Sequence, residues 1–417
     1  MESRVEDIVI VGAGIAGLAT SLGLHRLGVQ SLVLESSNNL RVTGFAISIW
    51  TNAWKALDAL GIGNILRQQH IQLRGNVTTS LMTGQQKSST ALANATGKHA
   101  AHEVRCVRRQ LLLEALANEL PSGTIRFSSK VVAIEESDFT KLVHLADGTV
   151  IRTKVLIGSD GVNSVVAKWL GFNKATFSRR VSIRGCVTLT SGHNLEPMFM
   201  QFFGKGCRNG VLPCDDKTVY WFFTSPHIEE EKKLEGNLAK LKQFVLEKLE
   251  SMPSDVKALI ENTDLDHILS TPLRYRHPWE LVFGNINKGN VCVAGDAFHP
   301  MTPDLGQGGC CALEDGVVLA RCLGEVFCTK PGEDVRNNKG EEEEEEQYKR
   351  IEASLKKYAN ERRWRSMNIV FVAYVTGIIR QGESKLVSFF RDKFFAAFLA
   401  VIQLKIADFD CGKLRSS

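Results

Sequence analysis

The chain has 417 residues, which predicts two or three domains, and its 44% hydrophobic and 23% charged residues exclude a largely disordered protein. Lysine and arginine exceed aspartate and glutamate by 51 − 46 = 5, too small an excess to predict nucleic-acid binding. The ten cysteines include no Cys-x-x-Cys pair, so we expect reduced, mostly buried thiols and neither a disulfide scaffold nor a metal site.

The chain begins with a strand, a glycine-rich turn, a helix and a second strand. Residues 8–11 form a continuous apolar run typical of a strand buried in a parallel sheet. The turn Gly12-Ala13-Gly14-Ile15-Ala16-Gly17 follows directly, and a helical pattern continues to Leu27. Residues 32–34 form the next buried strand, which ends at Glu35. This order predicts a dinucleotide-binding βαβ unit.

Each glycine of this turn has a mechanical purpose. Gly12 permits the tight turn, Gly14 lets a pyrophosphate approach the backbone, and Gly17 lets the helix pack closely on the strand. The helix N-terminus offers free N–H groups to the phosphates. Glu35 follows Gly17 by 18 residues, a spacing that suits a carboxylate accepting hydrogen bonds from an adenosine ribose.

The next elements alternate between helices and strands. We predict helices over residues 54–66 and 105–120, and short strands over residues 125–151. Residues 155–157 form another buried strand, which leads into Gly158-Ser159-Asp160-Gly161. Residues 179–225 are rich in β-branched and aromatic side chains, which predicts an antiparallel sheet. An amphipathic helix is expected over residues 229–252.

A second glycine-and-acid region follows a buried strand at residues 291–294. Asp296 of Gly295-Asp296 lies where the sheet ends, and its carboxylate suits the hydroxyl groups of a ribityl chain. The run Pro303-Asp304-Leu305-Gly306-Gln307-Gly308-Gly309 precedes a helix predicted over residues 308–327. Free N–H groups and the helix dipole at this point suit the electron-rich edge of a flavin. The sequence therefore favours FAD over NAD as the resident cofactor.

The remaining chain divides at a polar segment. Residues 331–347 contain six consecutive glutamates and are expected to be an exposed, flexible linker, with an acidic docking segment as the alternative. Residues 348–405 are predicted to be mostly helical. The apolar residues 394–406 are too few to span a bilayer, and we expect them to pack on the body rather than bind a membrane surface. We expect a cytoplasmic protein, since no apolar signal sequence is apparent.

Three motifs in order give a specific resemblance. They are Gly12/Gly14/Gly17 with Glu35, then Asp160-Gly161 with Ser164, then Gly295-Asp296 with Gly306-Gln307-Gly308. Over residues 5–325 the chain resembles the group A FAD-dependent aromatic hydroxylases, the family of p-hydroxybenzoate hydroxylase and zeaxanthin epoxidase, and most of all its plant salicylate-hydroxylase-like branch. One departure is Ala167, with Lys168 next, where the family usually has arginine.

The resemblance implies an α/β fold: a Rossmann-like, p-hydroxybenzoate hydroxylase-like FAD-binding domain, an antiparallel β-sheet substrate domain and C-terminal helices. The implied division is residues 1–74, 102–178 and 288–330 for FAD, residues 75–101 and 179–287 for the substrate, linker 331–347 and helical segment 348–417. The cofactor-binding residues that it implies are Gly12, Gly14, Ala16, Gly17, Glu35, Ser36, Arg41, Arg109, Val132, Asp160, Asp296, Pro303, Gly306, Gln307, Gly308 and Gly309.

The implied activity is a monooxygenation. NADPH or NADH acts as a transient reductant, O2 adds to the reduced flavin as a hydroperoxide, and a small electron-rich, aromatic specialised metabolite is hydroxylated. The alternatives are epoxidation of an isoprenoid-like alkene, an oxygen-independent reduction, or a non-enzymatic flavoprotein.

The substrate wall is expected near residues 44–49 and in the β-rich segment. Candidate substrate contacts are Ile47, Phe199, Phe202 and Phe222, although aromatic side chains at alternate positions also suit a sheet core. Pro303, Arg184 and Tyr220 are the candidate catalytic residues, and Arg184 suits either a substrate carboxylate or an internal ion pair. Tyr220 and His227 are candidate bases, whereas His299 is expected to be a structural hydrogen-bonding residue.

Overall fold

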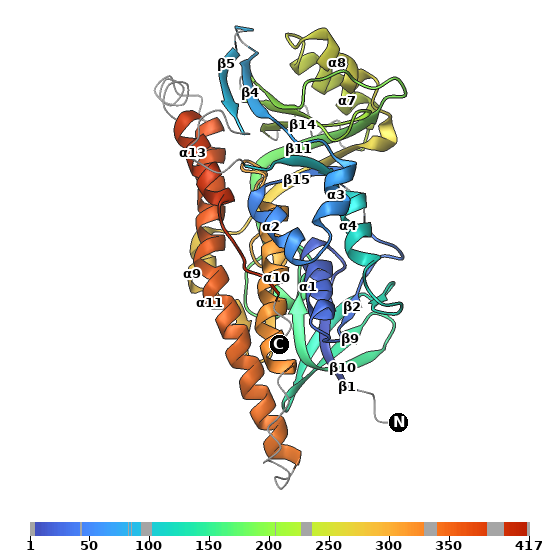
Figure 1. Ribbon diagram of the computed structural model, residues 1–417, viewed down its shortest axis with the longest axis vertical. Helices are drawn as coiled ribbons and strands as arrows, with labels where there is room; N and C mark the ends of the chain where they lie inside the picture. Colours follow the sequence, from blue (N-terminus) through green and yellow to red (C-terminus); the bar gives the residue numbers. More distant parts are fainter. Residues whose placement is uncertain are drawn as a thin grey trace.

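Two sheets occupy opposite ends of an elongated molecule, and a long helix runs beside both (Figure 1). The structure is a computed structural model. It describes residues 5–41, 44–81, 83–84, 86–92, 102–204, 206–226, 236–328, 340–381 and 396–414. His227 and most of the segment 331–347 lie outside these ranges.

The first sheet carries the N-terminal βαβ unit. Its main path has the order β16-β17-β10-β1-β2-β7, with β9 joined to β10 and β8 to β9. β1 pairs in parallel with both β10 and β2, and β17 pairs in parallel with β10. The strands are β1 (Val5–Val11), β2 (Leu32–Leu34), β7 (Ile125–Arg126), β8 (Val131–Ser137), β9 (Thr140–Leu145), β10 (Val150–Gly158), β16 (Asn287–Lys288) and β17 (Val291–Val293).

Segments far apart in sequence meet at the carboxyl ends of β1, β10 and β17. Their parallel pairing places the turn after Val11, the turn after Gly158 and the turn after Val293 at one edge of the sheet. Helices α1 (Ile15–Arg26) and α10 (Gly308–Phe327) begin at this edge and pack on each other. Ligands of open α/β sheets bind outside the carboxyl ends of their strands, so the fold brings the three predicted motifs to a binding edge.

The second sheet has the order β15-β11-β14-β13-β12-β4-β5. It is antiparallel except where β12 pairs with β4. Helices α7 (Leu238–Lys248) and α8 (Ser254–Glu261) cover its outer face (Figure 1). The strands are β4 (Gly75–Ser80), β5 (Gln86–Ala91), β11 (Thr176–Thr188), β12 (Met198–Phe203), β13 (Arg208–Pro213), β14 (Thr218–Pro226) and β15 (Ile268–Tyr275).

Shorter elements connect the two sheets. Where one helix was expected over residues 105–120, β6 pairs with β3 before α4 begins at Arg109, because Arg105–Arg108 find a partner strand. These elements are β3 (Ala46–Ile49), β6 (Arg105–Arg108), α2 (Thr51–Ala59), α3 (Gly63–Gln69), α4 (Arg109–Ala117), α5 (Val165–Trp169), α9 (Pro278–Phe283) and the short 3-10 helices Leu265–His267 and Gly295–Ala297.

The C-terminal region consists of α11 (Gly340–Gln381) and α13 (Ala396–Ala407). The expectation of a flexible linker up to residue 347 is wrong for residues 340–347, which form the first turns of α11. Glutamate is a good helix former, and carboxylates near a helix N-terminus interact favourably with the helix dipole. Lys349 also pairs with Glu345 one turn earlier, at 2.6 Å.

Among the described residues, no helix is both long enough and apolar enough to cross a membrane.

Candidate cofactor and substrate site

The turn after β1 has the geometry that its glycines predict. Gly12 has φ +102°, in the left-handed region, and a Cβ at Gly17 would lie 2.0 Å from the carbonyl oxygen of Gly12. Both glycines are therefore required by the backbone itself. Gly14, the residue before α1, is different, because a Cβ there would meet no atom within 4 Å. The space in front of Gly14 is open to a ligand at the N-terminus of α1.

Glu35 is buried at the end of β2 and organises this turn. Its Oε2 accepts a hydrogen bond from the Ala13 N–H at 2.9 Å, and its Oε1 accepts bonds from Ser37 N at 2.9 Å and Ser36 Oγ at 3.2 Å. Its carbonyl oxygen accepts from Ser129 N, three residues before the exposed Val132 on β8. Glu35 and Ser36 thus lie at this edge, and Ala16 lies close to Gly295, where an added Cβ would be 2.8 Å from the Ala16 Cβ. Val132 lies on β8, which pairs with β9.

Asp160 lies against the same turn, because its Cα would be 3.0 Å from a Cβ at Gly12. Its carboxylate accepts hydrogen bonds from the Ser164 hydroxyl and from Val165 N at 2.7 Å, while Ser164 caps α5. Burial raises the pKa of Asp160, and these hydrogen bonds oppose the shift. Asp160 holds the start of α5 beside the turn, with Ala167 buried inside that helix.

Arg109 and Asp296 lie close enough to interact through their charges. Burial lowers the pKa of Arg109, and the charge of Asp296 opposes that shift. Arg109 Nε is buried and has no hydrogen-bond partner among the described residues. Asp296 is exposed and likewise makes no hydrogen bond or ion pair within the described chain. Arg41 is exposed, and its Nη2 donates to Ser37 Oγ at 3.3 Å.

The loop Pro303–Gly309 closes the same space from the side of α10. Gly306 has φ +64°, and a Cβ there would lie 2.7 Å from Ser48 Oγ. Gln307 precedes α10, and its buried Nε2 has no partner among the described residues. The first N–H groups of α10, at Gly308 and Gly309, are available to a ligand.

The groups around this space match the chemical groups of FAD. The glycine cradle suits a pyrophosphate, the Asp296 carboxylate suits a polyol, and the buried donors on Arg109 and Gln307 suit the polar edge of a flavin ring. The residues present therefore fit this cofactor.

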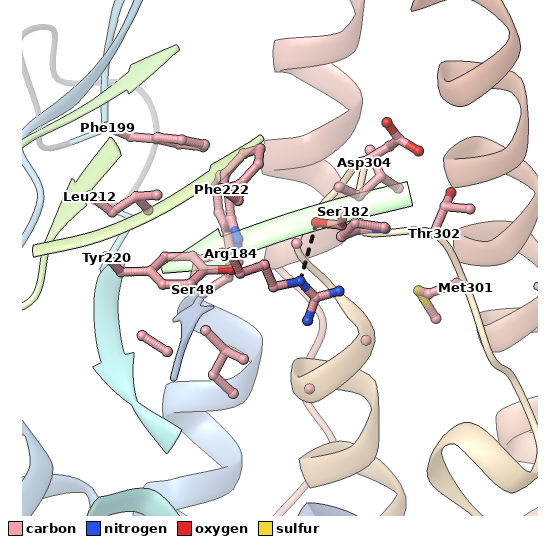
Figure 2. A pocket seen from close by; sticks show the side chains of 18 of the residues that line it. Ser48, Ser182, Arg184, Phe199, Leu212, Tyr220, Phe222, Met301, Thr302 and Asp304 are labelled. Carbon is pink, nitrogen blue, oxygen red and sulfur yellow. Dashed lines mark hydrogen bonds between the residues drawn. The ribbon is translucent and has the colours of Figure 1, made fainter. Parts of the chain in front are cut away.

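A cavity of about 190 Å³, partly open to solvent, continues from this space toward the second sheet. Figure 2 shows Arg184 of β11 pointing into it between Tyr220 and Met301. The lining residues are Ala46, Ile47, Ser48, Trp50, Ser182, Arg184, Phe199, Gln201, Arg208, Leu212, Tyr220, Phe222, Asp296, Met301, Thr302, Pro303, Asp304, Leu305, Gly306, Gly308, Gly309 and Gln403.

Strand alternation decides which predicted substrate residues reach the cavity. Phe199 and Gln201 of β12 face it, whereas Phe202 packs with Ile183 and Trp221 in the core under α7 and α8. The expectation that Phe202 contacts substrate is therefore wrong, because residues three apart on a strand point to opposite faces. Ile47, Tyr220 and Phe222 do line the cavity.

Arg184 is a cationic lining residue whose terminal N–H groups are available to a ligand. Its Nε donates to Ser182 Oγ at 3.2 Å, and its terminal nitrogens have no partner among the described residues. Arg208, by contrast, donates to Gln201 Oε1 at 2.7 and 3.0 Å. Burial raises the pKa of Tyr220 to about 12, with Arg184 opposing the shift, so its hydroxyl stays protonated at neutral pH. Tyr220 is therefore suited to donate a hydrogen bond.

His299 lies outside the cavity lining. It is fully buried, and its Nε2 is 2.6 Å from Asp315 Oδ2, which agrees with the structural role expected for it.

Sequence reasoning missed several lining residues. Gln201 could have been found from its alternation with Phe199, and Ser182 from its alternation with Arg184. Gln403 of α13 could not, because only tertiary packing brings this helix to Leu305, whose carbonyl accepts from Gln403 Nε2 at 3.0 Å.

Comparison with known proteins agrees with this geometry. Residues 6–344 match the family described as FAD binding domain. The chain is 52% identical to Monooxygenase 2 of Arabidopsis thaliana, over 99% of both chains, and 37% identical to Monooxygenase 1 of the same plant, over 98% of this chain and 99% of that one. The crystal structure of Klebsiella pneumoniae HpxO complexed with FAD and uric acid matches with a TM-score of 0.79 and 25% identity, over 97% of this chain and 96% of that chain.

The chain belongs to the FAD binding domain family, which confirms the predicted fold class and the predicted cofactor FAD. It is an FAD-dependent monooxygenase of the aromatic hydroxylase type. The resemblance to group A flavin hydroxylases is thereby confirmed.

Proposed function

We propose that the protein uses NADPH or NADH and O2 to hydroxylate a small electron-rich aromatic compound that carries a carboxylate or another anionic oxygen. The observation that carries this proposal is Arg184, a cation in the cavity with its terminal N–H groups unengaged by the described residues. A planar guanidinium with free parallel donors binds a carboxylate in a bidentate manner. Uric acid, bound by the similar Klebsiella protein, is also a small planar acid.

The two carboxylates that line the cavity leave the charge of Arg184 available, which supports an anionic substrate. Asp304 pairs with Arg180, and Asp296 faces the cofactor space near Arg109, so neither carboxylate is placed to neutralise Arg184. Aromatic side chains at Phe199, Tyr220 and Phe222 provide an apolar surface for a ring. The Tyr220 hydroxyl is a further donor toward an oxygen atom of the substrate.

The residues also suggest how the ring is activated. No histidine is among the described residues that line the cavity. Of its two carboxylates, Asp304 is paired with Arg180, and Asp296 interacts with the charge of Arg109 beside the cofactor space. A cation beside a phenol lowers the pKa of that phenol, so Arg184 would favour the more reactive phenolate without a general base.

FAD, when bound, supplies the redox chemistry in which one atom of O2 enters the product. The chain itself contributes three functions. The N-terminus of α10 would favour negative charge on a flavin edge bound beside it, the aromatic wall would exclude water, and Arg184 would orient the ring.

The test compares matched pairs of aromatic compounds, each with a carboxylate and with the neutral amide, as stimulants of NADPH and NADH oxidation by the FAD-loaded protein. We expect the acids to be favoured, with label from 18O2 in the product. Arg184→Gln should remove the preference, whereas Arg274→Gln, an exposed arginine of β15 outside the cavity lining, should preserve it. Equal use of acids and amides would exclude the anionic substrate, and an unlabelled product would exclude oxygenation.

A further inference from the structure

Buried ion pairs connect helix α11 to α10 and, through α10, to the loops of the predicted cofactor site. Arg362 is fully buried, and its guanidinium lies 2.6 Å from Glu314 Oε2 and 2.7 Å from Asp315 Oδ1. Arg365, one turn further along, donates to Glu314 Oε1 at 2.8 Å and to the carbonyl oxygen of Ile406 at 2.8 Å. Two arginines of α11 therefore face two buried carboxylates of α10.

Asp315 connects this charge cluster to the loop that carries Asp296. Its Oδ2 accepts a hydrogen bond from Gly295 N at 2.8 Å and from His299 Nε2 at 2.6 Å. Gly295 and His299 flank Asp296 on either side. The Tyr358 hydroxyl of α11 donates to the carbonyl oxygen of Val293, at the end of the strand before the same loop.

Glu314 connects the cluster to the loop before α10. Asn52 Nδ2 donates to Glu314 Oε1 at 2.6 Å and to Gln307 Oε1 at 3.0 Å. Gln307 is the residue directly before α10, between Gly306 and Gly308 of the predicted flavin edge. The path from Arg365 through Glu314 and Asn52 thus ends at the cofactor loop.

The buried carboxylates of Glu314 and Asp315 depend on the arginines to stay ionised. Burial alone would raise the pKa of Glu314, yet Arg362 and Arg365 hold that pKa below its ordinary value. Burial likewise opposes ionisation of Asp315, and His299 and Arg362 hold its pKa low. A buried carboxylate without its cation is costly, so loss of an arginine would force Glu314 or its partners to move.

We propose that Arg362 and Arg365 are positioning residues for FAD. They act through Glu314 and Asp315 to hold Gly295–His299 and Gly306–Gly308 in the arrangement that binds the cofactor. The inference rests on the cofactor site and is independent of the proposed substrate, because FAD binding is measured without substrate.

The experiment uses Arg365→Gln, since Arg365 is less buried than Arg362 and its replacement leaves Arg362 on Glu314. Arg363→Gln is the matched control, because Arg363 lies on the same helix and donates only to backbone carbonyls at the end of α9. The FAD dissociation constant, the visible spectrum of bound flavin and the melting temperature of the apoprotein are measured for each variant.

We expect Arg365→Gln to weaken FAD binding by about 2- to 30-fold, the range of coupling through a packed network, and to alter the flavin spectrum. Arg365→Lys should restore part of the loss. Arg363→Gln should lower the melting temperature of the apoprotein and leave FAD affinity unchanged. Unchanged FAD affinity in Arg365→Gln, or an equal loss in Arg363→Gln, would overturn the proposal.

Asn52→Ala removes the contacts that join Glu314 to Gln307. This variant tests the proposal if Arg365→Gln does not fold. We expect weaker FAD binding in this variant as well. Where both variants fold, the double variant should lose less affinity than the two single losses combined, because both act on Glu314 Oε1. An Asn52→Ala protein that binds FAD as the wild type does would also overturn the proposal.

Discussion

Arg180 of β11 and Asp304 of the loop before α10 form a buried, two-pronged ion pair at the cavity wall, where Asp304 is a lining residue. Arg180 Nη1 donates to Asp304 Oδ1 at 3.0 Å, and Nη2 donates to Oδ2. Gly377 of α11 packs on this pair, since a Cβ there would lie 3.1 Å from Arg180 Nη2. The pair joins the second sheet to the loop Pro303–Gly309 that closes the predicted cofactor space.

We expect loss of the Arg180–Asp304 ion pair to destabilise the folded protein. Asp304→Asn leaves the Arg180 guanidinium buried without its counter-charge, which should lower the free energy of unfolding by about 3–5 kcal/mol. Urea unfolding of the apoprotein measures the loss. The control is Glu119→Gln, which breaks the half-exposed pair Arg26–Glu119 and should cost about 0–1 kcal/mol. Similar losses in the two variants would show that the Arg180–Asp304 pair is not a stabilising contact.

Gly14 and Gly17 should respond differently to alanine. Gly17→Ala places a Cβ 2.0 Å from the carbonyl oxygen of Gly12, so the apoprotein should lose about 1–3 kcal/mol or more and bind little FAD. Gly14→Ala meets no protein atom within 4 Å, so the apoprotein should keep its melting temperature while FAD binding weakens. Melting curves and FAD titrations separate the two effects. Normal FAD affinity in Gly14→Ala would mean that the open space there is not cofactor space.

Tyr220→Phe should change substrate binding and leave the pH profile unchanged. The pKa of Tyr220 is raised to about 12 by burial, so the hydroxyl does not ionise in the working range. We expect KM to rise by about 2- to 13-fold from one lost hydrogen bond, with the same dependence of kcat on pH between about 6 and 9. Tyr275→Phe, which removes a hydroxyl outside the cavity lining, is the control. Disappearance of an ionisation from the profile would identify Tyr220 as a base after all.

Acid should destabilise the protein through Glu314 and Asp315. Their folded-state pKa values are lowered from 4.5 and 3.8, so their contribution to stability is present above those values and is lost as the pH falls through the lowered ones. Unfolding midpoints measured from about pH 7 to 3 should fall most steeply in the acid range. Glu314→Gln should flatten that decline, whereas Glu325→Gln, on the surface, should not. If the unfolding midpoint of Glu314→Gln depends on pH as that of the wild type does, Glu314 is not a source of the acid destabilisation.

Much of the cofactor site could be predicted from local sequence. Gly12, Gly14 and Gly17 can be recognised as a turn motif because they lie within one short segment. Gly12 has positive φ, and Gly17 lies against the carbonyl oxygen of Gly12, five residues earlier. Glu35 and Asp296 each follow a buried strand, and parallel strands end at one edge of a sheet. These local patterns favour FAD, and the family resemblance that the same residues carry implies the fold class; the comparisons confirm both.

The substrate wall and the contribution of the C-terminal helices required the tertiary structure. Phe202 and Phe199 are equivalent aromatic residues in the sequence, and only the strand register places one in the core and the other in the cavity. Arg362, Arg365 and Gln403 carry no motif. They reach the cofactor loops because α11 packs along α10, and α13 lies beside α11 and packs near Leu305 (Figure 1). Turn chemistry is local and can therefore be read along the chain, whereas the packing of distant helices depends on shape and charge that only the folded molecule brings together.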